Sequence, residues 1–64
     1  MSAASFRFLG RAALVTGAGS GIGLGMARTF ARNGMNVVLC DIRRDALDQA
    51  LSEVNRLGAQ AIAV

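Results

Sequence analysis

Four glycines alternate with other residues in the segment TGAGSGIG, residues 16–23, and this cluster constrains the fold more than any other feature of the chain. Residues 12–16 form a short apolar run that leads into it, which is typical of a strand buried on both faces. After it, Ile22, Met26 and Phe30 recur at four-residue steps, which predicts an amphipathic helix. The chain must therefore leave a strand, turn sharply through glycine and enter a helix within a few residues.

The same succession of strand and helix continues along the rest of the chain. Asn33 and Gly34 supply the left-handed stop that ends a helix, and residues 37–40 form a second apolar run. A second amphipathic helix closes at Gly58, and residues 61–64 begin a third strand. This order, with short connections, predicts a right-handed parallel α/β unit. The apolar face of the second helix is expected to comprise Leu47, Ala50, Leu51, Val54 and Leu57.

The predicted unit is incomplete at its edges. We expect residues 1–9 to form a loose tail, which would leave the first strand without a neighbour on one side. The second helix would start after Arg43, a poor capping residue. A compact fold of this size buries only about 60 % of its surface, and the single Cys offers no intramolecular disulfide. The chain is thus either a very small fold or part of a larger one, and the pattern of its elements favours the second.

The composition removes several chemistries from consideration. The chain contains no His, Tyr, Trp or Pro, and all seven of its basic residues are Arg. Without His there is no Ser/His pair and no imidazole metal ligand, and without Lys there is neither a GxxxxGK[ST] phosphate loop nor a Schiff-base lysine. One Cys cannot build a zinc site. We expect no catalytic residue and no metal site in these 64 residues.

Charge and hydropathy argue against two classes of partner. The formal net charge of +3 is small and scattered, and no aromatic–basic motif of a nucleic-acid surface accompanies it. The longest uncharged stretch, residues 12–27, contains five glycines and would span only about 24 Å of a roughly 30 Å bilayer core as a helix. We expect a cytoplasmic protein that binds neither nucleic acid nor membrane. A membrane-associated helix that dimerises through Gly17, Gly21 and Gly25 is the alternative.

The spacing of the glycines fits a phosphate-binding turn. The strict GxGxxG pattern fails in every register, whereas GxxxGxG fits at Gly17, Gly21 and Gly23. One glycine lets the chain turn out of the strand, a second lets backbone approach a pyrophosphate, and a third lets the helix pack closely on the sheet. The helix start directs free amides and its positive dipole end at the phosphates, and the Ser20 hydroxyl can add a donor. A tight structural turn that binds nothing is the alternative, but the strand–turn–helix–strand context favours a nucleotide site.

An acid follows at the position where such a site needs one. Asp41 lies at the tip of the second predicted strand, eighteen residues after Gly23. A carboxylate there can accept hydrogen bonds from both adenosine ribose hydroxyls and repels a 2′-phosphate. Arg43 and Arg44 could accommodate that phosphate or form a solvated pair at the helix start. The charge pattern favours NAD over NADP as the cofactor.

These residues resemble the short-chain dehydrogenase/reductase family. TGAGSGIG matches the family motif TGxxxGIG position by position, and the resemblance extends over about residues 8–64. It implies an α/β, Rossmann-type doubly wound parallel sheet, of which the chain holds only the N-terminal β-α-β-α-β portion. Asp41 would then hold the adenosine ribose, and Ile42 would flank the adenine. The pyrophosphate and nicotinamide side would be lined by Gly17, Ser20, Gly21, Ile22 and Gly23.

The resemblance also implies an activity for the family. Its members transfer hydride between a nicotinamide and an alcohol or carbonyl substrate, with a Ser, a Tyr-x-x-x-Lys pair and a supporting Asn. The chain lacks Tyr and Lys, so it would carry the dinucleotide half-site of such an oxidoreductase without the catalyst. A small-molecule substrate and a homo-oligomer are expected for the full-length protein. A non-catalytic nucleotide-binding or interaction fragment is the alternative.

Overall fold

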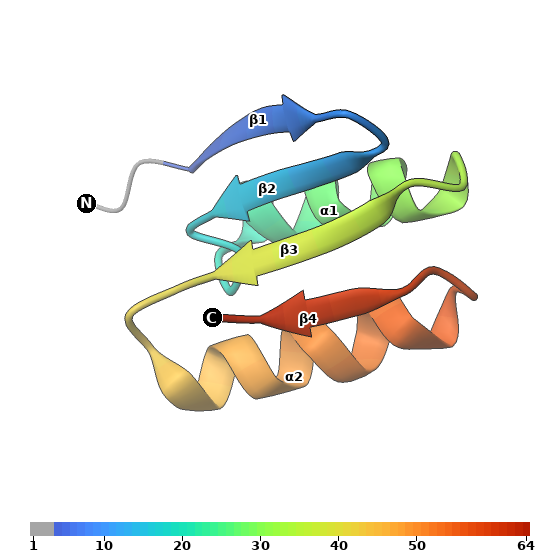
Figure 1. Cartoon of the computed structure of the whole chain (residues 1–64). Helices are drawn as coiled ribbons and strands as arrows, with labels where there is room; N and C mark the ends of the chain where they lie inside the picture. The colour runs from blue at the N-terminus through green and yellow to red at the C-terminus, as the bar shows by residue number, and fades with distance from the viewer. Residues whose placement is uncertain (1–3) are drawn as a thin grey trace.

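The computed structural model describes residues 4–64 as one four-stranded sheet with two helices (Figure 1). The strands are β1 (Ser5–Leu9), β2 (Ala12–Thr16), β3 (Asn36–Cys40) and β4 (Ala61–Ala63), and the helices are α1 (Gly21–Arg32) and α2 (Arg44–Arg56). The sheet order is β1-β2-β3-β4, with β2, β3 and β4 parallel to one another. The expected β-α-β-α-β portion of a mostly parallel α/β sheet is therefore confirmed from β2 to β4.

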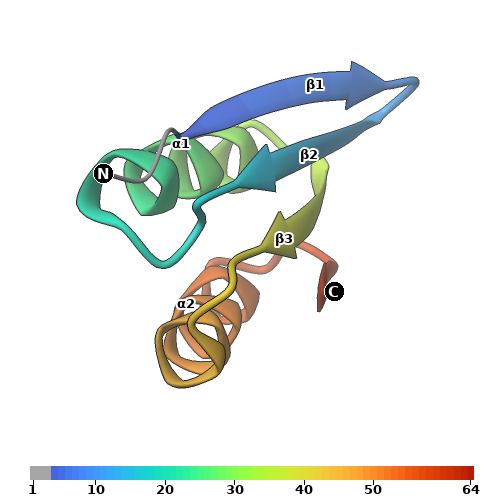
Figure 2. The same ribbon diagram turned by 90° about the vertical axis from the view of Figure 1, so that its left-hand side faces the viewer.

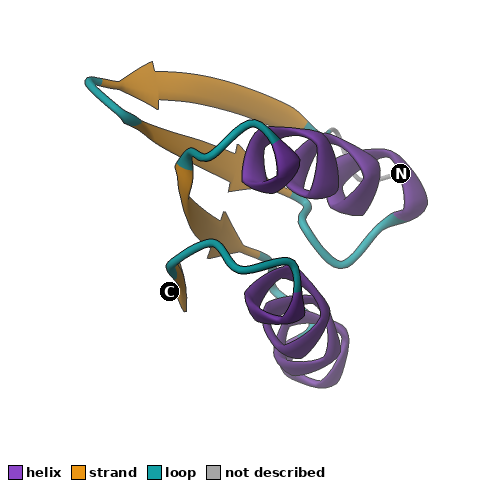
Figure 3. Cartoon of the chain, turned by 90° about the vertical axis from the view of Figure 1, so that its right-hand side faces the viewer, coloured by secondary structure: helices purple, strands orange, loops and turns teal. Residues whose placement is uncertain are grey.

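Both helices cover the same face of the sheet, and the core lies between them and the strands (Figure 3). Val15 and Leu39 on the strands and Leu47 and Val54 on α2 are at most 1 % exposed. Side chains alternate between the two faces of a strand, so the cross-strand row of Leu14, Val38 and Ile62 lies on the face without helices.

Both predicted amphipathic helices are confirmed, but their buried faces differ from the prediction in part. In α1 the buried residues are Gly23, Ala27 and Ala31, whereas Ile22 is exposed. In α2 they are Leu47, Ala50 and Val54, and Leu57 lies beyond the end of the helix.

The two helices start in different ways. Ser20 caps α1, and its side-chain oxygen accepts a hydrogen bond from the Gly23 amide. Arg43 is the N-cap residue of α2 and makes no side-chain cap hydrogen bond, as its residue type predicts. Asp45 in the first turn places a negative charge near the positive end of that helix. The poor cap expected at Arg43 is thus confirmed.

The N-terminal segment differs from the prediction. The expectation of a loose tail over residues 1–9 is wrong for Ser5–Leu9, which form β1 and pair antiparallel with β2; residues 1–3 lie outside the described part of the chain. Gly10, with a φ of 66°, makes the short turn between the two strands. The rings of Phe6 and Phe8 lie 5.2 and 5.4 Å from the ring of Phe30 on α1. This aromatic cluster and the hairpin turn hold the segment on the edge of β2, which therefore has a neighbour on both sides.

Candidate functional site

The turn that leads from β2 into α1 (Figure 2) is fixed to the neighbouring strand by a backbone hydrogen bond. Gly17 adopts a φ of 64°, in the left-handed region that favours glycine. The amide of Ala18, a fully buried residue, donates to the Cys40 carbonyl at 3.0 Å. The turn thus begins at the carboxyl end of β2 and is held against the carboxyl end of β3.

Gly23 permits the close contact between α1 and this turn. A Cβ placed on Gly23 would lie 2.1 Å from the carbonyl oxygen of Gly17 and 2.7 Å from its carbonyl carbon. Both atoms belong to the backbone, so no side-chain movement can relieve the overlap. Glycine is therefore required at position 23 by the fold itself, before any ligand is considered.

Ser20 links the same two residues through its hydroxyl. Its Oγ donates to the Gly17 carbonyl at 2.7 Å and accepts from the Gly23 amide at 3.1 Å. The hydroxyl proton is therefore committed to the turn, and the side chain serves as the helix cap. A contact of Ser20 with a phosphate, expected from the sequence, stays a prediction.

Gly21 and Ile22 leave the start of α1 open. A Cβ on Gly21 would meet no atom within 4 Å, and the Ile22 residue is 75 % exposed. Among residues 4–64, none accepts a hydrogen bond from the amide of either residue. The first turn of α1 also contains no acidic side chain. Free donors and the positive end of the helix dipole therefore meet at an accessible point.

Asp41 follows β3 and faces the glycine turn. Its side chain is only 3 % exposed. Oδ2 accepts from the Gly19 amide at 2.8 Å and from Arg43 Nη2 at 3.2 Å, while Oδ1 accepts from the Arg43 amide at 2.9 Å and from Arg43 Nε at 3.2 Å. Because a carboxylate offers about four acceptor positions, the carboxylate of Asp41 is fully occupied within the chain.

These contacts lower the pKa of the Asp41 carboxyl well below its ordinary value. The largest cause is the Arg43 guanidinium, followed by the backbone amides of Arg43 and Gly19. In the unfolded chain the carboxyl takes up a proton as the pH falls through about 4, whereas in the folded chain it stays ionised to lower pH. The contribution of Asp41 to stability is therefore fully present above about pH 5 and is lost progressively below about pH 4.

The pH dependence of this stabilisation gives a test of the Asp41 contacts. Asp41→Asn should melt at a lower temperature than the unchanged chain at pH 7, and the difference should shrink steadily as the pH is lowered from 5 to 2.5. Thermal melts followed by circular dichroism at several pH values measure it. Glu53, whose pKa is also lowered, is present in both proteins and cancels in the difference. A gap in melting temperature that is the same at pH 7 and pH 2.5 contradicts the assignment.

Two residues of the site were missed from the sequence. Gly19 falls outside the GxxxGxG spacing, yet a Cβ on it would lie 2.7 Å from Cβ of Ala46 and 3.0 Å from Oδ2 of Asp41. Apart from its place at the start of the second helix, the sequence suggests Arg43 as a phosphate ligand or a solvated charge, whereas the structure shows it in an ion pair with Asp41. The short spacing from Asp41 to Arg43 was the available signal, because an Asp side chain often binds the backbone amide two residues on. Ile42 between them is fully exposed.

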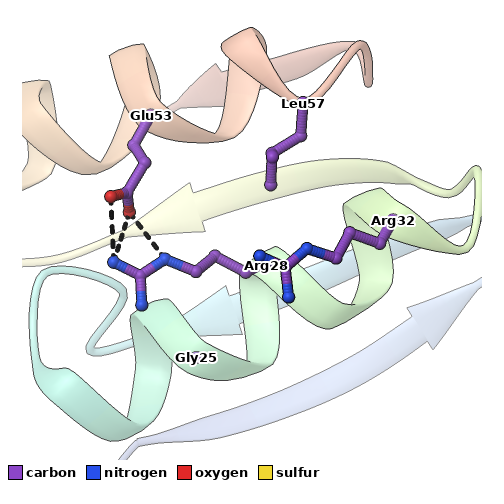
Figure 4. Close-up of a pocket in the computed structure, with 5 residues that line it drawn as sticks. All are labelled: Gly25, Arg28, Arg32, Glu53 and Leu57. Carbon is purple, nitrogen blue, oxygen red and sulfur yellow. Dashed lines mark hydrogen bonds and ion pairs between the residues drawn. The ribbon is translucent and has the colours of Figure 1, made fainter.

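A hollow lies between the two helices (Figure 4). It measures about 420 Å³ and is lined by Gly25, Arg28, Arg32, Glu53 and Leu57. Arg28 Nε and Nη2 donate to the two carboxylate oxygens of Glu53 at 2.8 and 2.9 Å, which raises the pKa of Arg28 and lowers that of Glu53. This bidentate pair joins α1 to α2, and the hollow includes none of the site residues expected from the sequence.

Neither helix within residues 4–64 has the length and apolar character needed to cross a bilayer. In the same part of the chain, no three His, Cys, Asp or Glu side chains gather in a way that could hold a metal ion.

Comparison with known proteins places this geometry in context. Residues 11–64 match the short chain dehydrogenase family. The chain is 46 % identical over 59 residues to 7alpha-hydroxysteroid dehydrogenase of Escherichia coli (strain K12). That match covers 92 % of this chain and 23 % of the E. coli protein. It is 52 % identical over 54 residues to 1-deoxy-11-beta-hydroxypentalenate dehydrogenase of Streptomyces exfoliatus. That match covers 84 % of this chain and 20 % of the relative. The chain thus spans less than a quarter of the length of these relatives.

Solved structures show the same arrangement. NAD+-bound xylitol dehydrogenase superimposes with a TM-score of 0.78 at 41 % identity, over 80 % of this chain and 20 % of that one. The apo form of LigD from Sphingobium sp. strain SYK-6 gives a TM-score of 0.77 at 36 % identity, over 83 % of this chain and 22 % of that one. Both similarities extend over most of this chain and about a fifth of the other one, so the fold described above is shared with part of two longer proteins.

Proposed function

Because this chain belongs to the short chain dehydrogenase family, we propose that it forms the dinucleotide-binding half-site of an oxidoreductase that acts on an alcohol or carbonyl compound. The observation that carries the proposal is the open start of α1, where the Gly21 position is free of neighbours and the amides of Gly21 and Ile22 have no acceptor among residues 4–64. A bound nicotinamide dinucleotide would accept or supply the hydride. The described residues bind and orient it.

The pyrophosphate fits the start of α1. The amides of Gly21 and Ile22 would donate to its oxygens, and the helix dipole adds favourable partial charge. The absence of an acid from the first turn of α1 removes a source of repulsion. Gly23 and Gly17 act indirectly, because their contact sets the position of the helix start relative to β2.

The adenosine half fits the carboxyl end of β3. Asp41 would accept hydrogen bonds from the ribose hydroxyls, and the exposed side chain of Ile42 would lie against the adenine. Since all four acceptor positions of Asp41 are already used, the Arg43 guanidinium must move before the ribose can bind. Arg43 thus competes with the ribose of NAD, while a displaced Arg43 can pair with the 2′-phosphate of NADP. We propose NAD as the favoured cofactor because the carboxylate lies at the strand end itself.

Titration of the 64-residue chain with NAD and NADP, followed by ligand-observed NMR, tests this function. We expect NAD to bind more tightly than NADP. Arg43→Ala should raise the preference for NAD roughly tenfold by freeing two acceptor positions, and Asp41→Ala should reverse it toward NADP by a similar factor. Arg56→Ala, which removes one positive charge far along α2, is the matched control and should leave the ratio unchanged. Absence of binding of both dinucleotides at millimolar concentration contradicts the proposal.

A further inference from the structure

The hollow between α1 and α2 carries more positive charge than the fold neutralises. Arg28 and Arg32 line it from α1, and Glu53 lines it from α2 (Figure 4). The carboxylate of Glu53 is held by Nε and Nη2 of Arg28. Arg32 forms no ion pair with any acidic side chain among residues 4–64. Two guanidinium groups therefore line the hollow, and only one of them has an acidic partner.

The surroundings of Glu53 show that positive charge is concentrated here. The hydrogen bond with Arg28 is the largest cause of the lowered pKa of Glu53, and the charges of Arg56 and Arg32 lower it further. Of the residues that line the hollow, Glu53 alone is acidic. One carboxylate is thus surrounded by three arginines, so an anion that enters the hollow meets a net positive charge.

Gly25 gives an independent indication that the hollow is kept open. It lies in the interior of α1, where glycine is less favourable than alanine. A Cβ on Gly23 would overlap backbone, whereas a Cβ on Gly25 would meet no atom within 4 Å. The packing of the fold therefore gives no reason for glycine at position 25. The lack of a side chain does leave room in the hollow that Gly25 lines.

The hollow has the size and the walls of a small-ligand site. Its volume of about 420 Å³ falls within the range of about 300–1,000 Å³ that is usual for ligand pockets. Figure 4 shows Leu57 directed from the end of α2 toward α1, so an apolar wall stands beside the charged groups. The bidentate pair of Arg28 and Glu53, at 2.8 and 2.9 Å, shows that a carboxylate fits a guanidinium here.

We propose that this hollow is a binding site for a dicarboxylate, separate from the dinucleotide half-site. One carboxylate accepts hydrogen bonds from the Arg32 guanidinium, as Glu53 accepts them from Arg28. The second is attracted by Arg56, and the short chain between the two carboxylates lies against Leu57. Two negative charges balance the two arginines that Glu53 leaves without a partner. Because the start of α1 takes no part in this site, a failed NAD titration leaves it standing.

Titration of the 64-residue chain with succinate, followed by the NMR signals of the Gly25, Arg32 and Leu57 amides, tests the site. We expect these signals to shift and to saturate with a Kd of about 1 mM. Butyrate, which has the same number of carbons and one carboxylate, should bind at least about fivefold more weakly. Arg32→Gln should weaken succinate binding about tenfold or more.

Arg7→Gln is the charge-matched control, because it removes one positive charge from an exposed position on β1. It should change the affinity for succinate by less than about twofold. Equal weakening by Arg32→Gln and Arg7→Gln would show only a general attraction of anions to a basic chain and overturns the site.

Two further variants should act in opposite directions. Glu53→Gln releases Arg28 from its acidic partner, so succinate should bind about threefold more tightly or better. Gly25→Val places a side chain in the hollow and should weaken succinate binding about tenfold in a chain that still folds, since the position is open. Weaker binding by Glu53→Gln, or unchanged binding by Gly25→Val, contradicts the proposal.

A blocked tri-glutamate peptide distinguishes the two sources of such a dicarboxylate. Tighter binding of this peptide than of succinate assigns the site to acidic side chains of a polypeptide. Weaker binding of the peptide assigns it to a free dicarboxylate. Absence of binding of both probes at about 20 mM overturns the proposal.

Discussion

Gly23→Ala is expected to lower the melting temperature by about 10 °C or more, although it adds only one methyl group. That methyl carbon would lie 2.1 Å from the Gly17 carbonyl oxygen, so α1 and the turn must separate. Overpacking typically costs about 1–3 kcal/mol, and in a domain of this size each 1 kcal/mol moves the melting temperature by about 4–8 °C. The overlap is with backbone, which places the expected effect at the upper end of that range.

Gly25→Ala supplies the matched control for this prediction. Gly25 lies on the same helix, and a Cβ there would meet no atom within 4 Å. Alanine favours a helix interior over glycine, so Gly25→Ala should melt at the same temperature or a few degrees higher. Thermal melts of both variants decide the point. Equal melting temperatures for Gly23→Ala and Gly25→Ala would show that the contact between α1 and the turn is looser than described.

Gly21→Val should have the opposite profile, with an almost unchanged melting temperature and a loss of NAD affinity of about 100-fold. The fold leaves space for a side chain at position 21, since no atom lies within 4 Å of the Cβ position. That space is where we propose that the pyrophosphate approaches the amides of Gly21 and Ile22, and an isopropyl group there would exclude it. A loss of 100-fold corresponds to about 2.7 kcal/mol of binding free energy.

The control for this second prediction is Gly25→Val. It introduces the same side chain one turn further along α1, again into open space. It should raise helix propensity as much as Gly21→Val, or more, and leave NAD affinity within about twofold. Titrations by ligand-observed NMR, with melts of the same samples, separate the two effects. If Gly21→Val binds NAD as tightly as Gly25→Val does, the start of α1 is not the phosphate site.

The three glycines of the turn illustrate which features the sequence predicts and which only the geometry supplies. The spacing of Gly17, Gly21 and Gly23 predicts that one glycine serves the turn, one the ligand and one the helix packing. Only the geometry assigns the positive φ to Gly17, the backbone contact to Gly23 and the open space to Gly21. The roles differ because they depend on what lies opposite each Cβ position, which is set by elements far apart in the sequence.

The strands and helices were predictable where the apolar residues of a segment follow a single pattern, either a continuous run or a helical repeat. The apolar run of β2 and the four-residue steps of α1 are local signals, and both elements form where they were expected. β1 was missed because its stability comes from pairing with β2 and from the contacts of Phe6 and Phe8 with Phe30. The alternation of Phe6, Arg7 and Phe8 before Gly10 was the available signal of a hairpin. The hydrogen bond from the Gly19 amide to the Asp41 carboxylate was likewise missed, because it joins the end of β3 to the turn after β2.

If Asp41 holds the ribose as we propose, its crowded carboxylate makes recognition of a coenzyme an exchange of hydrogen bonds rather than the filling of an empty site. Each hydrogen bond that a sugar hydroxyl makes to this group replaces one that the chain already has. The affinity for the sugar would therefore report the difference in binding free energy between the ribose hydroxyls and the Arg43 guanidinium, and not the strength of either interaction alone. A single neighbouring arginine would in this way set the concentration at which NAD begins to bind, without itself contacting NAD.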